Sequence, residues 1–297
     1  ASDIPAFLPY TRDVVFLEDG EIVRITPNSW EIFSIDGLKP LEKKIQRIDW
    51  DLQAAQKGGY KHYMLKEIFE QPRAITDCMA GRVDQQRMEV SIAELKGKNT
   101  PERLRIVACG TSYHAGLWAL PLFETWAGIP CAVEIASEFR YRDPLLGKNE
   151  LVLVISQSGE TADTLAAMRI AREKGCSVLG LCNVVGSSIA READTVIYTQ
   201  AGPEISVAST KALSTQMAAL LLMALHWGRE RAVIDLELQH KAVKGLLALP
   251  TQLESLLPTL QVEAKALAMK YASHKGMFFL GRGQSYPLAM EGALKVK

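Results

Sequence analysis

Short apolar runs alternate with longer amphipathic stretches through the middle of the chain. Five of the runs are rich in leucine and β-branched residues and predict strands, at 104–108, 131–135, 151–155, 177–181 and 195–199. Stretches with apolar residues at helical spacing predict helices, which begin at Ser112, Thr161, Ser187 and Ser209. Because parallel sheets are built from strands that alternate with crossover helices, we expect an α/β fold: a doubly wound parallel sheet flanked by helices, with its ligand site at the carboxyl ends of the strands.

The chain before this alternation has a different pattern. Two apolar runs within residues 14–25 are separated by the sequence EDG and predict a β-hairpin. From Ile48 to about Lys98 the sequence is charged, with apolar residues at helical spacing. We therefore expect a hairpin segment followed by a helical connector.

A weak internal repeat lies near the end of the sequence. Residues 106–113 read IVACGTSY and residues 279–286 read FLGRGQSY, so Gly110 and Gly283 each begin the pattern Gly-x-Ser-Tyr. The repeat predicts a second α/β domain, of which only a first strand and part of a helix are included. Between the copies, leucines at helical spacing that are interrupted by two prolines predict a helical link.

The composition is that of an ordinary globular protein. Of 297 residues, 48% are hydrophobic and 23% charged, and 34 basic residues balance 34 acidic ones. We therefore expect no electrostatic binding of nucleic acid or of acidic lipid. The longest apolar run, residues 217–225, is too short to cross a bilayer and predicts a buried helix. No charged and apolar leader follows Ala1, which favours a cytoplasmic location.

The cysteines favour the same location. They are odd in number and form no CxxC pair, which is typical of reduced thiols: Cys78, Cys109, Cys131, Cys176 and Cys182. Cys109 precedes a glycine turn and could act as a nucleophile, but a buried, unreactive thiol is the more common role. We expect neither a metal nor a cofactor.

The stretch LVLVISQSGETADT, residues 151–164, carries the most specific chemistry. A strand ends at Ser156, a hydroxyl-rich turn follows with Gly159, and a helix begins at Thr161. The hydroxyls and the unpaired N–H groups of the helix can bind an anion together. Because the lysine-containing P-loop and the GxGxxG motif are both absent, we expect a small phosphoester. The alternative is a helix that Ser158 or Thr161 caps, without a ligand.

Four motifs in this order, CGTSY, SQSGETADT, CNVVGSSIARE and VASTKA, resemble the sugar isomerase (SIS) domains of the glutamine:fructose-6-phosphate amidotransferase family. The resemblance implies that ammonia from glutamine aminates fructose 6-phosphate to give glucosamine 6-phosphate, and that the chains pair as homodimers. It divides the chain into the last strands of a glutaminase-type domain (1–35), a helical connector (36–95), a first SIS domain (96–245), and a helical link with the start of an incomplete second SIS domain (246–297).

The resemblance also assigns site residues in this sequence. The phosphate of a hexose 6-phosphate would be held by Ser156, Gln157, Ser158 and Thr161. Thr111 and Ser112 would contact the sugar phosphate from the neighbouring strand end. Val207 and Ser209 would line the sugar site, and Lys295 matches a lysine of the family's sugar-handling region. We also expect Ser112 to cap the helix that begins there.

The groups that perform the family's chemistry are expected outside this sequence. The glutaminase nucleophile would precede Ala1, and the glutamate, histidine and lysine that act on the sugar would follow Lys297. Since isomerisation needs groups that titrate near the working pH, we expect this chain to bind hexose 6-phosphates without turnover. Two other functions share the phosphate turn: a regulatory sugar-phosphate sensor without catalysis, and a sugar-phosphate isomerase complete in one domain.

Structural roles are expected for the other polar residues near these turns. His114 lies in the first turn of a helix, and no carboxylate in its neighbourhood in the sequence is placed to tune it. Glu160 and Asp163 are expected as partners of a helix dipole. Arg140 and Arg142 are expected in surface salt bridges.

Overall fold

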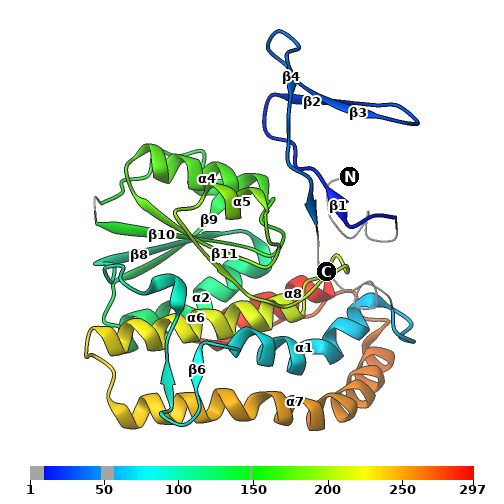
Figure 1. Cartoon of the computed structure of the whole chain (residues 1–297). Helices are drawn as coiled ribbons and strands as arrows, with labels where there is room; N and C mark the ends of the chain where they lie inside the picture. Colours follow the sequence, from blue (N-terminus) through cyan, green and yellow to red (C-terminus); the bar gives the residue numbers. More distant parts are fainter. Residues whose placement is uncertain (1–9, 48–56, 148) are drawn as a thin grey trace. The chain divides into compact units, whose positions relative to one another are not determined.

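The computed structural model describes residues 10–47, 57–147 and 149–297, and the chain forms two compact units that meet at Gly58 and Gly59 (Figure 1). The first unit consists of short strands. Its three-stranded antiparallel sheet has the order β2 (Glu21–Ile25), β3 (Trp30–Ser34), β4 (Pro40–Leu41). A separate pair is formed by β1 (Asp13–Val14) and β5 (Gln46–Arg47).

The hairpin of this unit lies later in the sequence than expected. β2 pairs with β3, and Thr26 N–H donates to Ser29 O at 2.8 Å to close the turn between them. The hydroxyls of the same two residues lie 2.7 Å apart. The hairpin predicted over residues 14–25 is therefore wrong, because the threonine and serine hydroxyls make the closing turn. Within residues 40–47, expected in the helical connector, Pro40–Leu41 form β4 and Gln46–Arg47 form β5.

A five-stranded parallel sheet forms the centre of the second unit, with the order β12-β11-β10-β8-β9 (Figure 1). Its strands are β8 (Arg103–Ala108), β9 (Cys131–Ile135), β10 (Glu150–Ser156), β11 (Ser177–Cys182) and β12 (Thr195–Tyr198). In the central strand, Ile155 lies opposite Ala108 on one side and Leu181 on the other. The predicted doubly wound α/β sheet is confirmed.

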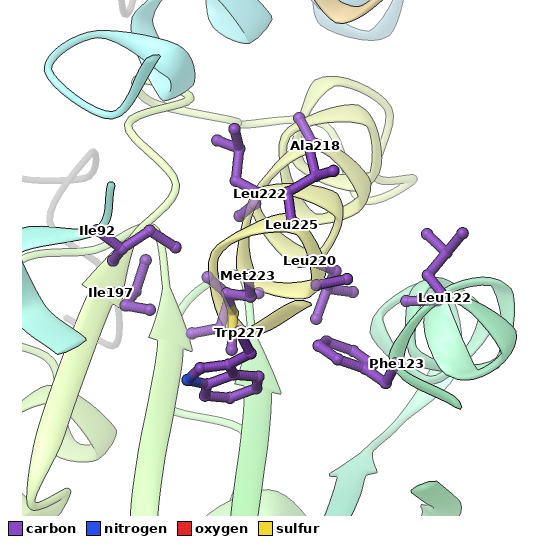
Figure 2. Packing of buried hydrophobic residues seen from close by; sticks show 14 of the residues in the cluster. Ile92, Leu122, Phe123, Ile197, Ala218, Leu220, Leu222, Met223, Leu225 and Trp227 are labelled. Carbon is purple, nitrogen blue, oxygen red and sulfur yellow. The ribbon is translucent and has the colours of Figure 1, made fainter. Parts of the chain in front are cut away.

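Helices cover both faces of this sheet. They are α2 (Gly110–Trp126), α3 (Ala136–Phe139), α4 (Ala162–Glu173), α5 (Ser188–Glu192) and α6 (Lys211–Glu230). α4 and α5 lie on one face, and α2 and α6 on the other (Figure 1). Figure 2 shows the larger apolar cluster, on the α6 side, where the ring centroids of Phe123 and Trp227 are 5.8 Å apart. The apolar run 217–225 lies within α6 and is largely buried, as predicted.

Further helices pack outside α6. α1 (Tyr63–Met79) contacts α6, and α7 (Leu236–Tyr271) contacts α1. After α1 the expected connector is not helical, because β6 (Val83–Asp84) and β7 (Glu89–Val90) form a small hairpin before the 3-10 turn η2 (Ala93–Leu95). Across the part of the chain that the structure describes, no helix is both long and apolar enough to cross a membrane.

α7 is one continuous helix of 36 residues that includes Pro250 and Pro258. The domain boundary expected at residue 246 therefore falls inside a helix. The strand expected in the second copy of the repeat is also not formed: residues 276–282 are irregular, with Phe278 97% exposed. A strand needs neighbouring strands to pair its backbone groups, and none of the described residues provides one here.

The repeat nevertheless has a structural counterpart. α8 (Ser285–Val296) packs against α2, and each of these helices follows or begins with the glycine of its Gly-x-Ser-Tyr pattern. Gly110 has a φ of +54° and Gly283 a φ of +57°. Left-handed backbone of this kind favours glycine, so both copies turn into their helices in the same way.

Candidate functional site

The two predicted binding turns meet where the strand order of the sheet reverses. β8 and β10 are neighbours in the sheet, but β9, which lies between them in the sequence, is at the outer edge. The connections after β8 and β10 therefore leave toward opposite faces, as α2 and α4 (Figure 1). In open parallel sheets, ligands bind at such a switch point, outside the carboxyl ends of the strands. Thr111 follows β8 and Ser158 follows β10 at this point.

The turn after β10 is organised by its own hydrogen bonds. Ser156 Oγ accepts from Gly159 N–H at 3.0 Å and lies 2.8 Å from Thr161 Oγ1. Ser158 Oγ accepts from Glu160 N–H at 3.1 Å. Ser156 is 2% exposed, whereas Ser158 and Thr161 are half-buried. Ser156 therefore shapes the turn from inside, and the Ser158 hydroxyl is better placed to donate to a ligand.

Gly159 makes this turn possible. Its φ is +68°, and a Cβ atom at this position would lie 2.0 Å from Ser187 Oγ and 2.5 Å from Ser187 Cβ. No side chain fits in that space. The 156–161 turn is thus packed directly against Ser187, the residue that precedes α5.

Both helices at the switch point begin without a side-chain cap. Cys109 precedes α2 and Thr161 precedes α4, and neither side chain makes a capping hydrogen bond. The first-turn N–H groups and the positive ends of both helix dipoles therefore remain for an anion. The expectation that Ser112 caps α2 is wrong, because α2 already begins at Gly110; Ser112 Oγ instead accepts from Gln216 Nε2 at 3.0 Å.

Thr111 belongs to a polar cluster that includes two residues of α8. Its Oγ1 donates to Glu291 Oε1 at 2.9 Å and accepts from Lys295 Nζ at 3.0 Å. His114 Nδ1 lies 2.6 Å from Glu291 Oε2, and Lys295 Nζ lies 2.7 Å from Glu291 Oε1. The structure thus brings two of the predicted site residues, Thr111 and Lys295, into contact across 184 positions of sequence.

Glu291 is the residue at this site that the sequence did not reveal. Burial by itself raises the pKa of its carboxyl, but hydrogen bonds from Lys295, His114 and Thr111 and the charge of Lys295 outweigh burial, so the pKa lies below 4.5. The expectation that no carboxylate lies near His114 is wrong. The i,i+4 spacing of Glu291 and Lys295 was visible in the sequence, whereas their approach to His114 depends on the packing of α8 on α2.

A buried asparagine connects the 156–161 turn to the loop after β12. Asn183 N–H donates to Gln157 O at 3.1 Å. Its side chain donates from Nδ2 to Gly202 O at 2.7 Å and accepts at Oδ1 from Ala201 N–H at 2.8 Å. Asn183 therefore links the ends of two neighbouring strands to the start of the 199–210 loop.

Val207 and Ser209, the other predicted site residues, lie in this loop. Val207 is fully exposed and Ser209 is half-buried. Glu204 Oε1 accepts from Thr210 N–H at 2.8 Å and from Ala212 N–H at 3.1 Å, which ties the loop to the start of α6. Burial raises the pKa of the Glu204 carboxyl, and the two backbone hydrogen bonds only partly oppose that shift.

The charged residues around the turn have polar partners within the protein. Glu160 accepts from both the N–H and the hydroxyl of Ser188 at 2.7 Å, so it holds the start of α5. Asp163 pairs with Arg140 at 2.8 Å, and Arg142 pairs with Glu134. The two arginines therefore form the surface salt bridges that the sequence suggested.

The five cysteines are free thiols. Burial raises the pKa of Cys78 to about 11 and those of Cys131 and Cys182 to about 12. Thiols with such pKa values carry little thiolate at neutral pH and are poor nucleophiles. Over residues 10–47, 57–147 and 149–297, no group of three or more His, Cys, Asp or Glu side chains is arranged to hold a metal ion.

Comparison with known proteins identifies relatives over the whole chain. A family model described as SIS domain matches residues 99–226. The chain is 48% identical over its full length to glutamine–fructose-6-phosphate aminotransferase (isomerizing) of Clostridium acetobutylicum, and covers 49% of that protein. It is 47% identical to the protein of the same name from Methanosarcina acetivorans, of which it covers 48%. The chain thus spans about half the length of the curated relatives it matches.

A solved structure supports the same relationship. The C-terminal domain of glucosamine-fructose-6-phosphate aminotransferase from Francisella tularensis superposes with a TM-score of 0.76 at 41% identity. The match covers 82% of this chain and 68% of the solved one. The agreement therefore extends beyond the residues that the family model matches.

Proposed function

Because this chain belongs to the glutamine–fructose-6-phosphate aminotransferase family, we propose that the switch point of its parallel sheet binds the phosphate of a hexose 6-phosphate, with fructose 6-phosphate as the substrate. In this proposal Gln157, Ser158 and Thr161 contact the phosphate, and Ser156 holds the turn in shape. Thr111 and Lys295 contact the ligand from the β8 side, and the loop with Val207 and Ser209 lies along the sugar.

The observation that carries this proposal is the convergence of two uncapped helix starts on one hydroxyl-rich turn. α2 and α4 begin on either side of the switch point, and the Ser158 hydroxyl lies between strand and helix at the same edge. Neutral hydroxyl and N–H donors suit a small phosphate dianion. Lys295, which is paired with Glu291, donates to Thr111 Oγ1 at this edge of the sheet.

For the whole protein we propose the reaction that the relatives' names state: transfer of the amino group of glutamine to fructose 6-phosphate, with isomerisation to glucosamine 6-phosphate. The residues of this chain would bind and orient the sugar phosphate for that reaction. The cytoplasmic location and the homodimer stay predictions. Light scattering of the purified protein would measure the number of chains.

Calorimetric titration with fructose 6-phosphate tests the binding proposal. Replacing Ser158 by alanine removes one hydroxyl from the turn, and we expect the binding free energy to weaken by about 1–3 kcal/mol. Ser177→Ala is the matched control, since Ser177 is exposed at the opposite end of the same sheet. Equal affinities of wild type and Ser158→Ala, or no binding by wild type, would contradict the proposed site.

A further inference from the structure

Glu67 of α1 is a buried carboxylate that accepts three hydrogen bonds from one distant loop. Its Oε1 accepts from Ile205 N–H at 2.6 Å and from Ser206 N–H at 3.1 Å. Its Oε2 accepts from the hydroxyl of Ser206. Glu67 is 2% exposed and lies 138 and 139 positions before these partners. A carboxylate that is buried this deeply is stable only while these donors stay in place.

A second contact between α1 and the same part of the chain lies one helical turn later. Lys211, at the start of α6, has a side chain that is 4% exposed and places its Nζ 2.7 Å from Glu70 Oε2. Lys66 lies 3.2 Å from the other oxygen of Glu70. The residues from 204 to 211 are therefore held by α1 at two points.

The loop between these anchors exposes its apex. Ser206 Oγ also lies 2.9 Å from Ala208 O, on the other side of a bend that carries Val207. Val207 is fully exposed at the tip of that bend. The position of Val207 is thus set by Ser206, and Ser206 is set by Glu67.

We propose that Glu67 is a positioning residue for the sugar portion of the ligand. The proposal rests on the proposed function, in which the loop around Val207 lies along the sugar. Glu67 touches no part of the ligand; it fixes the backbone of residues 205–206 and thereby places Val207 and Ser209. The phosphate turn at 156–161 makes its own hydrogen bonds, so it keeps its shape without Glu67.

The proposal predicts that a change at Glu67 affects the affinities for two phosphate-containing ligands differently. Inorganic phosphate needs only the turn and the helix starts, whereas fructose 6-phosphate also needs the loop. Glu67→Gln keeps the size of the side chain but replaces one acceptor oxygen by a donor facing Ser206. We expect this variant to bind fructose 6-phosphate about three-fold more weakly, and Glu67→Ala about ten-fold, with inorganic phosphate affinity within about two-fold of wild type.

Amide chemical-shift titrations of the 297-residue chain with both ligands test this proposal. Glu150→Gln is the matched control, since Glu150 is also buried, accepts from Arg105 Nε at 2.7 Å and Gly147 N–H at 2.9 Å, and lies at the opposite end of β10. Glu150→Gln should change the free energy of unfolding but leave the affinities for fructose 6-phosphate and inorganic phosphate unchanged. Ser206→Ala alters the loop side of the same contact and should give the Glu67→Gln pattern, which keeps the test informative if a Glu67 variant folds poorly.

Each outcome has one meaning. Selective loss of fructose 6-phosphate affinity in both Glu67→Gln and Ser206→Ala supports the positioning role. Unchanged affinity, or an equal loss for both ligands, overturns it, provided that wild type binds fructose 6-phosphate and Ser158→Ala weakens that binding. Failure of wild type to bind fructose 6-phosphate overturns the proposed function itself.

Discussion

The 156–161 turn and the 199–210 loop occupy the same edge of the sheet but are held in different ways. Residues 156–161 make three hydrogen bonds among themselves, between partners at most five positions apart, and their longer-range hydrogen bonds go to residues 183–189. The loop after β12 is held by α1, more than 130 positions earlier in the sequence, as well as by its own Glu204. One part of the site is therefore local and the other depends on tertiary packing.

Because of this difference, we expect the turn and the loop to tolerate different substitutions. A locally bonded turn keeps its shape as long as β10 and α4 are in place, because loop closure within six residues costs little entropy. A loop that is fixed by a distant helix responds to any change in how that helix packs. Substitutions that damage one part and spare the other would show that the two parts are separable.

The largest effect is expected from Gly159→Ala, in the local part. The substitution combines left-handed backbone with a steric clash against Ser187, and we expect it to lower the free energy of unfolding by about 3 kcal/mol or more. Urea denaturation measures the loss. Gly175→Ala is the control, because Gly175 has a φ of +81° with no atom within 4 Å of an added Cβ. It should cost about 1 kcal/mol; equal losses would mean that the clash is relieved.

A smaller effect is expected from Lys211→Met, in the distant part. The variant removes a buried cation from Glu70, which keeps Lys66, so we expect a loss of about 2 kcal/mol in the free energy of unfolding. Arg73→Ala, on the same helix, removes an exposed pair with Asp77 and should cost less than about 0.5 kcal/mol. If the two variants unfolded at the same urea concentration, the loop would not depend on its contact with α1.

The smallest effect concerns the pH dependence of the Glu291 cluster. The pKa of Glu291 is lower in the folded chain than 4.5, so its stabilising contribution is complete above that pH and is lost as pH falls through the folded-state pKa. Glu291→Gln lacks this contribution. The difference in melting temperature between wild type and Glu291→Gln should therefore shrink as pH falls below 4.5. A difference that stayed constant from pH 6 to pH 3 would contradict this account.

The same contrast explains how far the sequence predicted the structure. The five strands, the α/β fold and the strand–turn–helix geometry at 156–161 follow from patterns that span a few residues, and for these features strand propensity, glycine and hydroxyl spacing suffice. The roles of Glu67 and Glu291 depend on pairs 138 and 177 positions apart, which no local pattern contains. The hairpin at 14–25 was mispredicted because a Glu-Asp-Gly turn looked stronger than the Thr26–Ser29 turn that forms.

Ser112 and residues 246–297 show two further limits of the sequence. A serine near a helix start resembles an N-cap, but the left-handed Gly110 lets α2 begin two residues earlier. The prolines do not break α7, as the predicted helical link requires, but the helix also runs through residue 246, where a domain boundary was expected. In each case a neighbouring residue or the length of the helix overrode the local preference.

The hydrogen bonds of Thr111 also set an order in which the site can assemble during synthesis. Its partners Glu291 and Lys295 lie 180 and 184 positions further along the chain. At about 5–20 residues per second, the ribosome adds them on the order of ten to forty seconds after Thr111. The turn at 156–161 can close during that interval, because all of its hydrogen-bonding partners are already made. A nascent chain would thus acquire the local half of the site well before the half that requires α8.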